Sequence, residues 1–298
     1  MKRIFYLSLL VSASLAANAQ KKLYISGTRL TRPLVEKWAE EFNKTQKDVV
    51  VAWAGREVPS DSVTLRILAF QLGAKDLKPH QSSIVITRYI QLPIANSQRP
   101  NLNELQTKGF TEADFKKVYF STEPGLVAVG SSPIVVYKRD KPACAAISFA
   151  GHYSSDPNKA PGVGVTGDDK DLSRAVKKDK NGISYNNLGF VYDLKTRKVS
   201  DSLAVIPLDL NENGKVDADE QIYETLDEVI SYTEKTNNPK IPTEGVNVVF
   251  NKETKNPNER KFLNWVLTEG QKFNNAFGFL NQTSQGLEVQ KSTLASNF

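Results

Sequence analysis

The stretch LYISGTRLTRPLVEKWAEEF, residues 23–42, decides the fold that we predict for this chain. Its first three residues predict a buried strand, and a polar loop follows over residues 26–31. The apolar residues after the loop recur at the spacing of one helical face; they are Leu34, Val35, Trp38, Ala39 and Phe42. Thr31 is placed to cap this helix, and Pro33 stands in its first turn, where a missing N–H costs nothing. A strand, a loop and a helix start therefore meet at one point.

This helix start is suited to an anion. Free N–H groups and the positive end of the helix dipole converge there, and Arg29 adds a full charge. The hydroxyl groups of Ser26 and Thr28 lie in the same loop. A plain strand-to-helix turn with a solvated arginine explains the same residues, and no complete glycine-rich fingerprint is present. On this stretch alone the plain turn is slightly favoured.

The strands that we predict further along the chain alternate with helices. Residues 48–53 form an apolar run typical of a parallel strand covered on both faces, and residues 84–86 form a third short strand. Residues 91–96 and 243–250 look extended and suit crossings between lobes, while residues 132–137 form another apolar strand. This alternation predicts an α/β protein whose ligands lie at the carboxyl ends of its strands.

Polar loops follow several of these predicted strands. The loop at 54–62 precedes a helical spacing over 63–72, and the charged loop at 138–142 precedes another over 145–152. The candidate binding residues in the loops are Ser60 and Ser62, Thr87 and Arg88, and Arg139 and Asp140. We also predict a hairpin from residues 190–193 and 199–208, and a final helix that opens at Pro257.

The first 19 residues have the pattern of a secretory signal peptide. Lys2 and Arg3 precede a short apolar run, and Ala17-Asn18-Ala19 is an A-x-A cleavage site. We therefore expect a soluble periplasmic or secreted protein. The net charge of +6 falls to +4 once Lys2 and Arg3 are removed. No basic stripe is present, so nucleic acid is not expected as a partner, whereas a small anion is compatible with the charge.

The stretch DLNENGKVDADE, residues 209–220, fits the twelve-residue EF-hand calcium loop. Glycine stands at the sharp turn, and an apolar residue at position 8 can anchor the loop. The predicted ligands are Asp209, Asn211, Asn213, Lys215 through its carbonyl, Asp217 and Glu220. A helix follows the loop, but a strand precedes it. We expect a structural calcium ion, and the alternative is an Asx-rich loop without metal.

Residues for catalysis are few. The chain has one cysteine, so no intramolecular disulfide can form, and it has two histidines. Cys144 and His152 would stand about 12 Å apart along one helix, too far for direct contact. Because no nucleophile and base are visibly paired, we do not expect an enzyme.

Several stretches together resemble the phosphate-binding family of periplasmic solute-binding proteins that serve ABC transporters. Residues 25–34, ISGTRLTRPL, are similar to the family's I-S-G-S-T-T-x-x-P-L start, and residues 37–42 continue the match. Thr87-Arg88 and residues 110–119 resemble further family segments. The C-terminal FLNWV, with the later EGQ and Gly278, resembles the family's last signature. The likeness covers nearly the whole mature chain.

The resemblance implies a two-lobed, type II periplasmic-binding-protein fold with two extended crossings. Lobe 1 would comprise residues 20–95 and 245–298, and lobe 2 residues 96–244 with the calcium loop. The anion would be held by Ser26, Thr28, Arg29, Ser60, Ser62, Thr87 or Arg88, and Arg139. The resemblance also implies an ABC permease as the partner of a monomeric protein, without enzymatic activity.

The sequence departs from the family pattern at the expected anion site. Residues 139–145, RDKPACA, replace R-x-x-S-G-T and lose two hydroxyl groups and a glycine. Arg29 replaces a small hydroxyl residue. Ser83 stands where an aspartate often precedes the third strand, and Asp61 or Asp140 are the substitutes available to accept a proton from the anion. The alternative is therefore a calcium-stabilised binding or interaction protein of the same fold that holds a different ligand.

Overall fold

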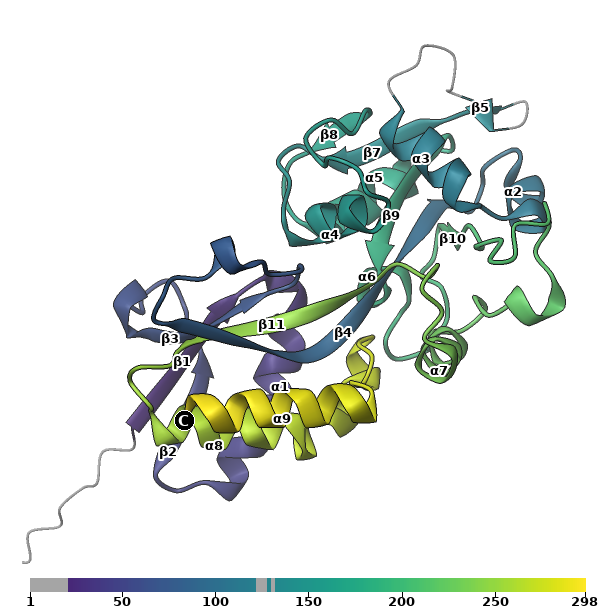
Figure 1. Ribbon diagram of the computed structural model, residues 1–298. Coiled ribbons are helices and arrows are strands. Elements are labelled where there is room, and N and C mark those ends of the chain that lie inside the picture. Colours follow the sequence, from purple (N-terminus) through teal and green to yellow (C-terminus); the bar gives the residue numbers. More distant parts are fainter. Residues whose placement is uncertain (1–20, 122–127, 130–131) are drawn as a thin grey trace, which may run out of the picture.

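The computed structural model describes residues 21–121, 128–129 and 132–298 (Figure 1). It has two lobes that are joined by two long strands, β4 (Gln81–Asn96) and β11 (Thr243–Asn251), as the sequence predicts. The predicted signal peptide lies outside the described residues. Within them, no helix combines the length and the hydropathy that crossing a membrane requires.

Lobe 1 contains the strand-loop-helix unit that the first stretch predicts. Strands β1 and β2 are parallel, as are β1 and β3, and β11 lies antiparallel between β3 and β4. The elements are β1 (Lys21–Gly27), α1 (Arg32–Thr45), β2 (Val49–Trp53), β3 (Val63–Leu68), α8 (Pro257–Leu267) and α9 (Ser284–Asn297). Short 3₁₀ turns complete it at Arg29–Thr31, Ser60–Ser62, Ala74–Asp76, Glu269–Phe273 and Asn275–Phe277.

Lobe 2 is built on the second half of β4. Strand β9 pairs antiparallel with β4 and parallel with β7, while β10 pairs with β4 at its far end. The elements are α2 (Leu102–Lys108), α3 (Glu112–Phe120), β5 (Ala128–Val129), β6 (Ser132–Pro133), β7 (Val135–Arg139), α4 (Cys144–His152), β8 (Val163–Val165), α5 (Asp169–Lys178), β9 (Gly182–Asn187), α6 (Leu188–Val191), β10 (Leu203–Val205), a 3₁₀ turn at Ala218–Glu220 and α7 (Leu226–Thr236).

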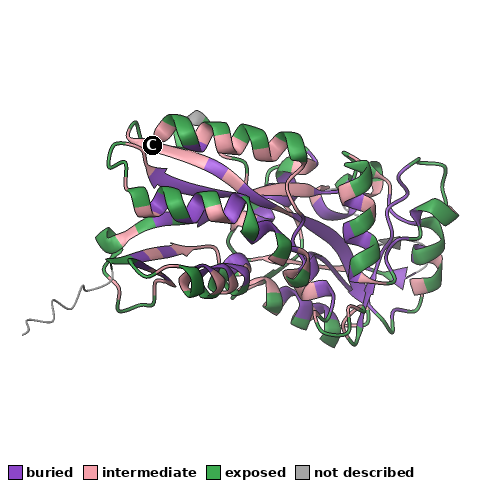
Figure 2. Ribbon diagram, turned by 90° about the horizontal axis from the view of Figure 1, so that it is seen from below, coloured by how far each residue is buried: buried purple, intermediate pink, exposed green. Residues whose placement is uncertain are grey.

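Each lobe has its own hydrophobic core. One cluster of buried residues gathers side chains from residues 23–89 and 246–294, and the other gathers side chains from residues 90–241 with Leu280. The border falls inside β4, where Tyr89 belongs to the first core and Ile90 to the second. Figure 2 shows buried residues along the central strands and exposed residues on the outer faces of the helices.

Helix α1 packs as its sequence predicts. All five of its predicted apolar positions are buried, and Trp38 donates its indole N–H to the Gly270 carbonyl at 2.9 Å. Gly27, just before the helix, has φ of +150°. A Cβ there would come within 2.1 Å of the Ile67 carbonyl oxygen, so only glycine lets β1 approach β3 this closely.

Three local predictions are wrong. Residues 63–72 do not form a helix, because residues 63–68 are strand β3, which alternates exposed and buried side chains between two neighbouring strands. The predicted hairpin is reduced to one bridge between Tyr192 and Val199, since residues 188–191 are helical and β10 pairs with β4. The helix that opens at Pro257 is followed by another, α9.

Candidate functional site

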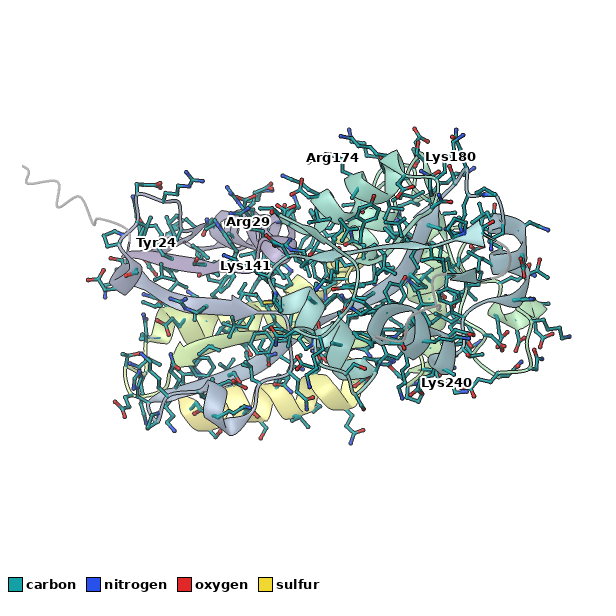
Figure 3. All side chains as sticks on the ribbon, turned by 90° about the horizontal axis from the view of Figure 1, so that it is seen from above. Tyr24, Arg29, Lys141, Arg174, Lys180 and Lys240 are labelled. Atoms are coloured by element: carbon teal, nitrogen blue, oxygen red, sulfur yellow. The ribbon has the colours of Figure 1, made fainter. Side chains whose placement is uncertain are left out.

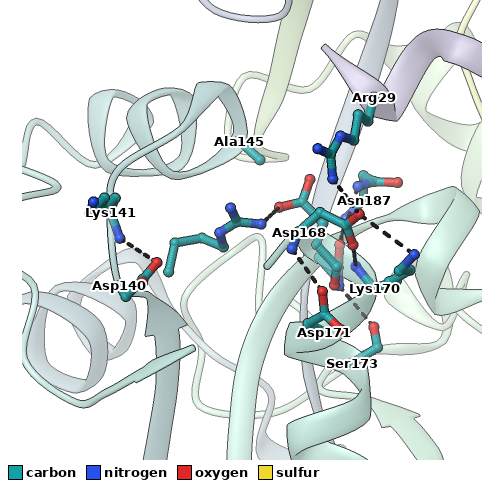
Figure 4. Close-up of polar contacts among 12 residues, drawn as sticks. Arg29, Asp140, Lys141, Ala145, Asp168, Lys170, Asp171, Ser173 and Asn187 are labelled. Atoms are coloured by element: carbon teal, nitrogen blue, oxygen red, sulfur yellow. Dashed lines mark hydrogen bonds and ion pairs between the residues drawn. The ribbon is translucent and has the colours of Figure 1, made fainter. Parts of the chain in front are cut away.

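A cluster of charged side chains joins the two lobes. Arg29, beside the start of α1 in lobe 1, lies 3.7 Å from a carboxylate oxygen of Asp168 in lobe 2. The next residue, Asp169, lies 3.7 Å from the guanidinium of Arg139, at the end of β7. These four residues form the interlobe charge cluster (Figure 4). Figure 3 shows Arg29 where the lobes meet and Arg174 farther out on lobe 2.

The two arginines of this cluster differ in burial. The side chain of Arg29 is 76% exposed, whereas that of Arg139 is 12% exposed. The Nε of Arg139 is buried and has no hydrogen-bond partner among the described residues. An unpaired buried donor on a cation is costly, so Arg139 has the capacity to bind a further acceptor. Asn187 Oδ1 is a second buried polar atom without a described partner.

The Asp169 carboxylate beside Arg139 is buried, and burial disfavours its ionised form. Burial raises the pKa of Asp169 to about 6, the charge of Arg139 opposes this rise, and the charge of Asp168 adds to it. Desolvation therefore outweighs the attraction of a guanidinium that is 3.7 Å away. An incoming anion would compete with this carboxylate for Arg139.

The N-terminus of α4 borders the same space between the lobes. Its N-cap residue, Ala143, offers no side-chain cap, and neither does Thr31 at the start of α1, whose hydroxyl donates to the Thr28 carbonyl at 3.0 Å. The start of α4 therefore keeps N–H groups that no capping side chain satisfies. At the start of α1 the Arg32 N–H donates to the Arg29 carbonyl, and Pro33 has no N–H. Cys144, in the first turn of α4, packs against the core of lobe 1. An apolar contact thus occupies part of the space at this helix start.

A buried tyrosine ties the lobes together next to α4. The Tyr89 hydroxyl, from β4, donates to the Ala69 carbonyl of lobe 1 at 2.8 Å and hydrogen-bonds to Ser148 of α4. Close by, the Gln91 side-chain amide donates to the Ala145 carbonyl at 2.8 Å. These contacts fix α4 against the strand that both lobes share.

We expect Tyr89→Phe to loosen this arrangement. The loss of the hydroxyl leaves buried acceptors unpaired and should lower the free energy of unfolding by about 1–3 kcal/mol. The radius of gyration from small-angle X-ray scattering should rise. Tyr192→Phe is the matched control, because its buried hydroxyl bonds to the Tyr223 carbonyl inside lobe 2. An equal radius of gyration in the two variants would contradict an interlobe role for Tyr89.

Of the predicted anion ligands, those of the first loop lie near the cluster and those of the second do not. Ser26 and Thr28 stand at the end of β1, where the Thr28 N–H donates to the Ile67 carbonyl. Ser60 and Ser62 precede β3, whose first residue pairs with the middle of β1. Ser62 lies about 20 Å from the end of β3, so both serines are on the amino-terminal side of the sheet.

Thr87 and Arg88 lie within β4 instead of in a loop. Thr87 is fully buried and donates its hydroxyl to the Leu280 carbonyl at 2.7 Å. The Arg88 guanidinium donates to the Asn281 carbonyl and to the Asn237 side chain. Both side chains are engaged in fixing the C-terminal segment, so the structure gives them partners other than a ligand.

Asp140 is exposed, and its carboxylate contacts Lys141 next to it and Thr166 just after β8. Its carboxylate accepts hydrogen bonds from the Thr166 hydroxyl at 2.9 Å and from the Lys141 N–H at 2.7 Å. The bond from Thr166, followed by that from Lys141, lowers the pKa of Asp140. The carboxylate that faces Arg139 is Asp169, which the sequence analysis did not select. A DD pair after Thr166-Gly167 was the available signal.

The predicted calcium loop is folded around two buried carboxylates. Asp209 and Glu220 are each 2% exposed and accept hydrogen bonds from backbone N–H groups of the loop. Gly214 has φ of +89°, the left-handed turn that its position demands. Val216 is buried and donates its backbone N–H to the Thr107 carbonyl in α2 at 2.8 Å, which anchors the loop to lobe 2.

The remaining oxygen ligands of this loop are turned toward one another. Asp217 binds the Lys215 ammonium at 2.6 Å and accepts from the side chains of Asn211 and Asn213. Among the described residues no three acidic, histidine or cysteine side chains converge as a metal cage would need. The oxygen-rich composition fits calcium, and Lys215 would have to release Asp217 for the ion to bind.

Two α/β lobes around shared strands, with helix starts and arginines between them, define the two-lobed fold of a periplasmic solute-binding protein. A Clostridium perfringens protein assigned to phosphate ABC transport and crystallised with phosphate superimposes with a TM-score of 0.64 at 17% identity, over 88% of this chain and 100% of that one. An ABC-type phosphate transport receptor from Vibrio cholerae gives 0.61 at 13%, over 87% and 100%. The phosphate-binding protein PfluDING gives 0.63 at 12%, over 91% and 93%.

These likenesses establish the fold that the sequence resemblance predicts. No protein-family model matches the sequence, and no curated protein matches it. The Clostridium perfringens and Vibrio cholerae structures are described as a substrate-binding protein and a receptor of phosphate transport.

Proposed function

We propose that this chain is an exported solute-binding protein that captures phosphate or a related oxyanion between its lobes and delivers it to an ABC permease. In this proposal the two lobes are divided as their cores are, so the border in β4 lies between Tyr89 and Ile90 and not at the predicted residues 95 and 96. The observation that carries the proposal is the buried Nε of Arg139, which has no hydrogen-bond partner within the described ranges and lies in the cluster that joins the lobes.

The proposed anion site combines groups from both lobes. Arg139 supplies a guanidinium, whose fork of N–H donors matches the oxygens of phosphate. Arg29 adds a second charge from lobe 1, and the uncapped start of α4 supplies N–H donors. Closure of the lobes would bring these groups around the ligand. Asp169 replaces Asp140 and Asp61 as the proposed carboxylate beside the anion.

Isothermal titration of the mature protein with phosphate, sulfate, arsenate and nitrate tests this proposal directly. We expect phosphate or another tetrahedral oxyanion to bind, because the proposed donors come from several directions. The absence of measurable heat at millimolar concentrations of every oxyanion would overturn it.

The second candidate is a protein of the same fold that binds another ligand. The specific observation in its favour is Cys144, which packs against the core of lobe 1 in place of the family's hydroxyl groups. Together with the Asp168 and Asp169 carboxylates, this contact fills space that an anion would need. The titration above distinguishes the two candidates.

We also propose that residues 209–220 bind one structural calcium ion. Two buried carboxylates within one short loop accept hydrogen bonds from neutral backbone N–H groups, and such a pair favours a cation. Extracellular calcium loops bind at roughly 10⁻⁴–10⁻³ M, so millimolar calcium would occupy the site. The ion would stabilise the part of lobe 2 that precedes α7.

Calcium at 5 mM should stabilise the protein by about 1–2 kcal/mol and raise its melting temperature by a few degrees relative to excess chelator. Glu220→Gln should suppress this shift, because a neutral amide cannot serve as a bidentate anionic ligand. Glu224→Gln, at an exposed residue just after the loop, should retain it. Identical melting curves of the parent protein with calcium and with chelator would refute the calcium site.

A further inference from the structure

A second polar space lies between the lobes, and its lining differs from the interlobe charge cluster. It is a cavity of about 430 Å³, and none of the four cluster residues lines it. Its walls come from residues 70–71 after β3, from residues 147–152 of α4 and from residues 242–244 at the start of β11. Helix α4 is on the side of lobe 2 that faces lobe 1 (Figure 1). The volume is within the usual range for sites that hold small organic molecules.

The charge in this cavity is negative. Glu244 lines it and has no lysine, arginine or histidine as an ion-pair partner among the described residues. Its carboxylate accepts the N–H of Gly245 at 2.6 Å, and burial raises its pKa. The other titratable side chain in the lining is His152, whose pKa is lowered by burial, so it is neutral at pH 7. A cation would therefore be attracted to this cavity, and an anion would be repelled.

Phe70, Ile147 and Pro242 add apolar side chains to this negatively charged lining. The combination suits a molecule with one charged polar end and an apolar body.

We propose that this cavity binds a small organic amine, with its ammonium group at the Glu244 carboxylate and its apolar body against Phe70 and Ile147. Both lobes contribute to the lining, so such a ligand would favour the arrangement in which α4 lies against the end of β3. This site is independent of the proposed oxyanion site, and either can fail without the other.

The test uses three molecules of one shape and different charge. Isoamylamine is a cation at neutral pH, isoamyl alcohol is neutral, and isovalerate is an anion. We expect calorimetric titration of the mature protein to show binding of the amine, weaker binding of the alcohol and none of the acid. Glu244→Gln should weaken amine binding by roughly tenfold or more, because it removes a charge-assisted contact. Phosphate binding should be the same in both proteins.

Two further variants keep the test decisive if Glu244→Gln does not fold. Ile147→Trp should fill the cavity from a side chain that is 37% exposed and abolish amine binding without lowering the melting temperature. Val163→Trp is its control, because Val163 is 50% exposed and does not line the cavity. Equal binding of amine and acid, no amine binding at 10 mM, or full amine binding by Ile147→Trp would each overturn the proposal.

Discussion

Replacing Arg139 with alanine is expected to weaken phosphate binding by roughly two orders of magnitude. A hydrogen bond to a charged group contributes about 1.5–3 kcal/mol, and 1.4 kcal/mol corresponds to a tenfold change in affinity. Arg139 is the buried arginine of the interlobe charge cluster, and its Nε has no other partner among the described residues. Isothermal titration of the parent protein and the variant measures the effect.

Two companion variants show whether the guanidinium itself is responsible. Arg139→Lys keeps the charge but loses the fork of donors, so its affinity should fall between those of the parent protein and Arg139→Ala. Arg174→Ala should bind phosphate normally, because Arg174 is 57% exposed on α5 and pairs with Asp171. Unchanged phosphate binding by Arg139→Ala would remove Arg139 from the proposed site.

Replacing Asp169 with asparagine is expected to stabilise the protein at neutral pH. The pKa of this carboxyl is about 6 in the folded protein and about 3.8 as a free side chain. The folded state therefore holds its proton over a range in which the unfolded state releases it. The proton on Asp169 therefore stabilises the folded state fully below about pH 4, and this stabilisation is lost as the pH rises through 6. Ionised Asp169 thus costs up to about 3 kcal/mol at pH 7, and the variant avoids this cost.

Urea unfolding of both proteins between pH 4 and pH 8 isolates this effect as the difference between them. The variant should gain stability relative to the parent protein as the pH rises from 4 to 7, and the difference should then level off. Asp171→Asn should lose stability relative to the parent protein as the pH rises. The reason is that the hydrogen bond from the Asp168 N–H is the main cause that lowers the pKa of Asp171. A pH-independent difference for Asp169→Asn would show that this carboxyl titrates normally.

The sequence predicts the elements whose signals are local. The apolar face of α1 and the extended crossings at β4 and β11 follow from residue types and spacing. The predicted Thr31 cap is wrong, because the Thr31 hydroxyl donates to the Thr28 carbonyl and caps no N–H group of α1. Strand β3 was misassigned because its apolar residues also fit a helical face. Only its pairing with two strands that are distant in the sequence settles its structure.

The candidate site was predictable only in part, because it depends on contacts between the lobes. Arg29 and Arg139 could be selected for their charge and their place at helix starts. Asp168 and Asp169 look like ordinary helix-start acids, and only the folded chain brings them to the two arginines. The burial that changes the pKa of Asp169 also comes from tertiary packing, on which the spacing of residues gives no information.

The placement of the border between the cores inside β4 has a consequence for the order in which the chain folds during synthesis. The core of lobe 1 needs α8 and Leu294 of α9, so it is incomplete until the C-terminus has been made. The core of lobe 2 uses residues 90–241 and Leu280, so most of it is available earlier. Lobe 2 can therefore fold first, with the second half of β4 already in place. The N-terminal strands of lobe 1 can complete their core only after α8 and α9 have been synthesised.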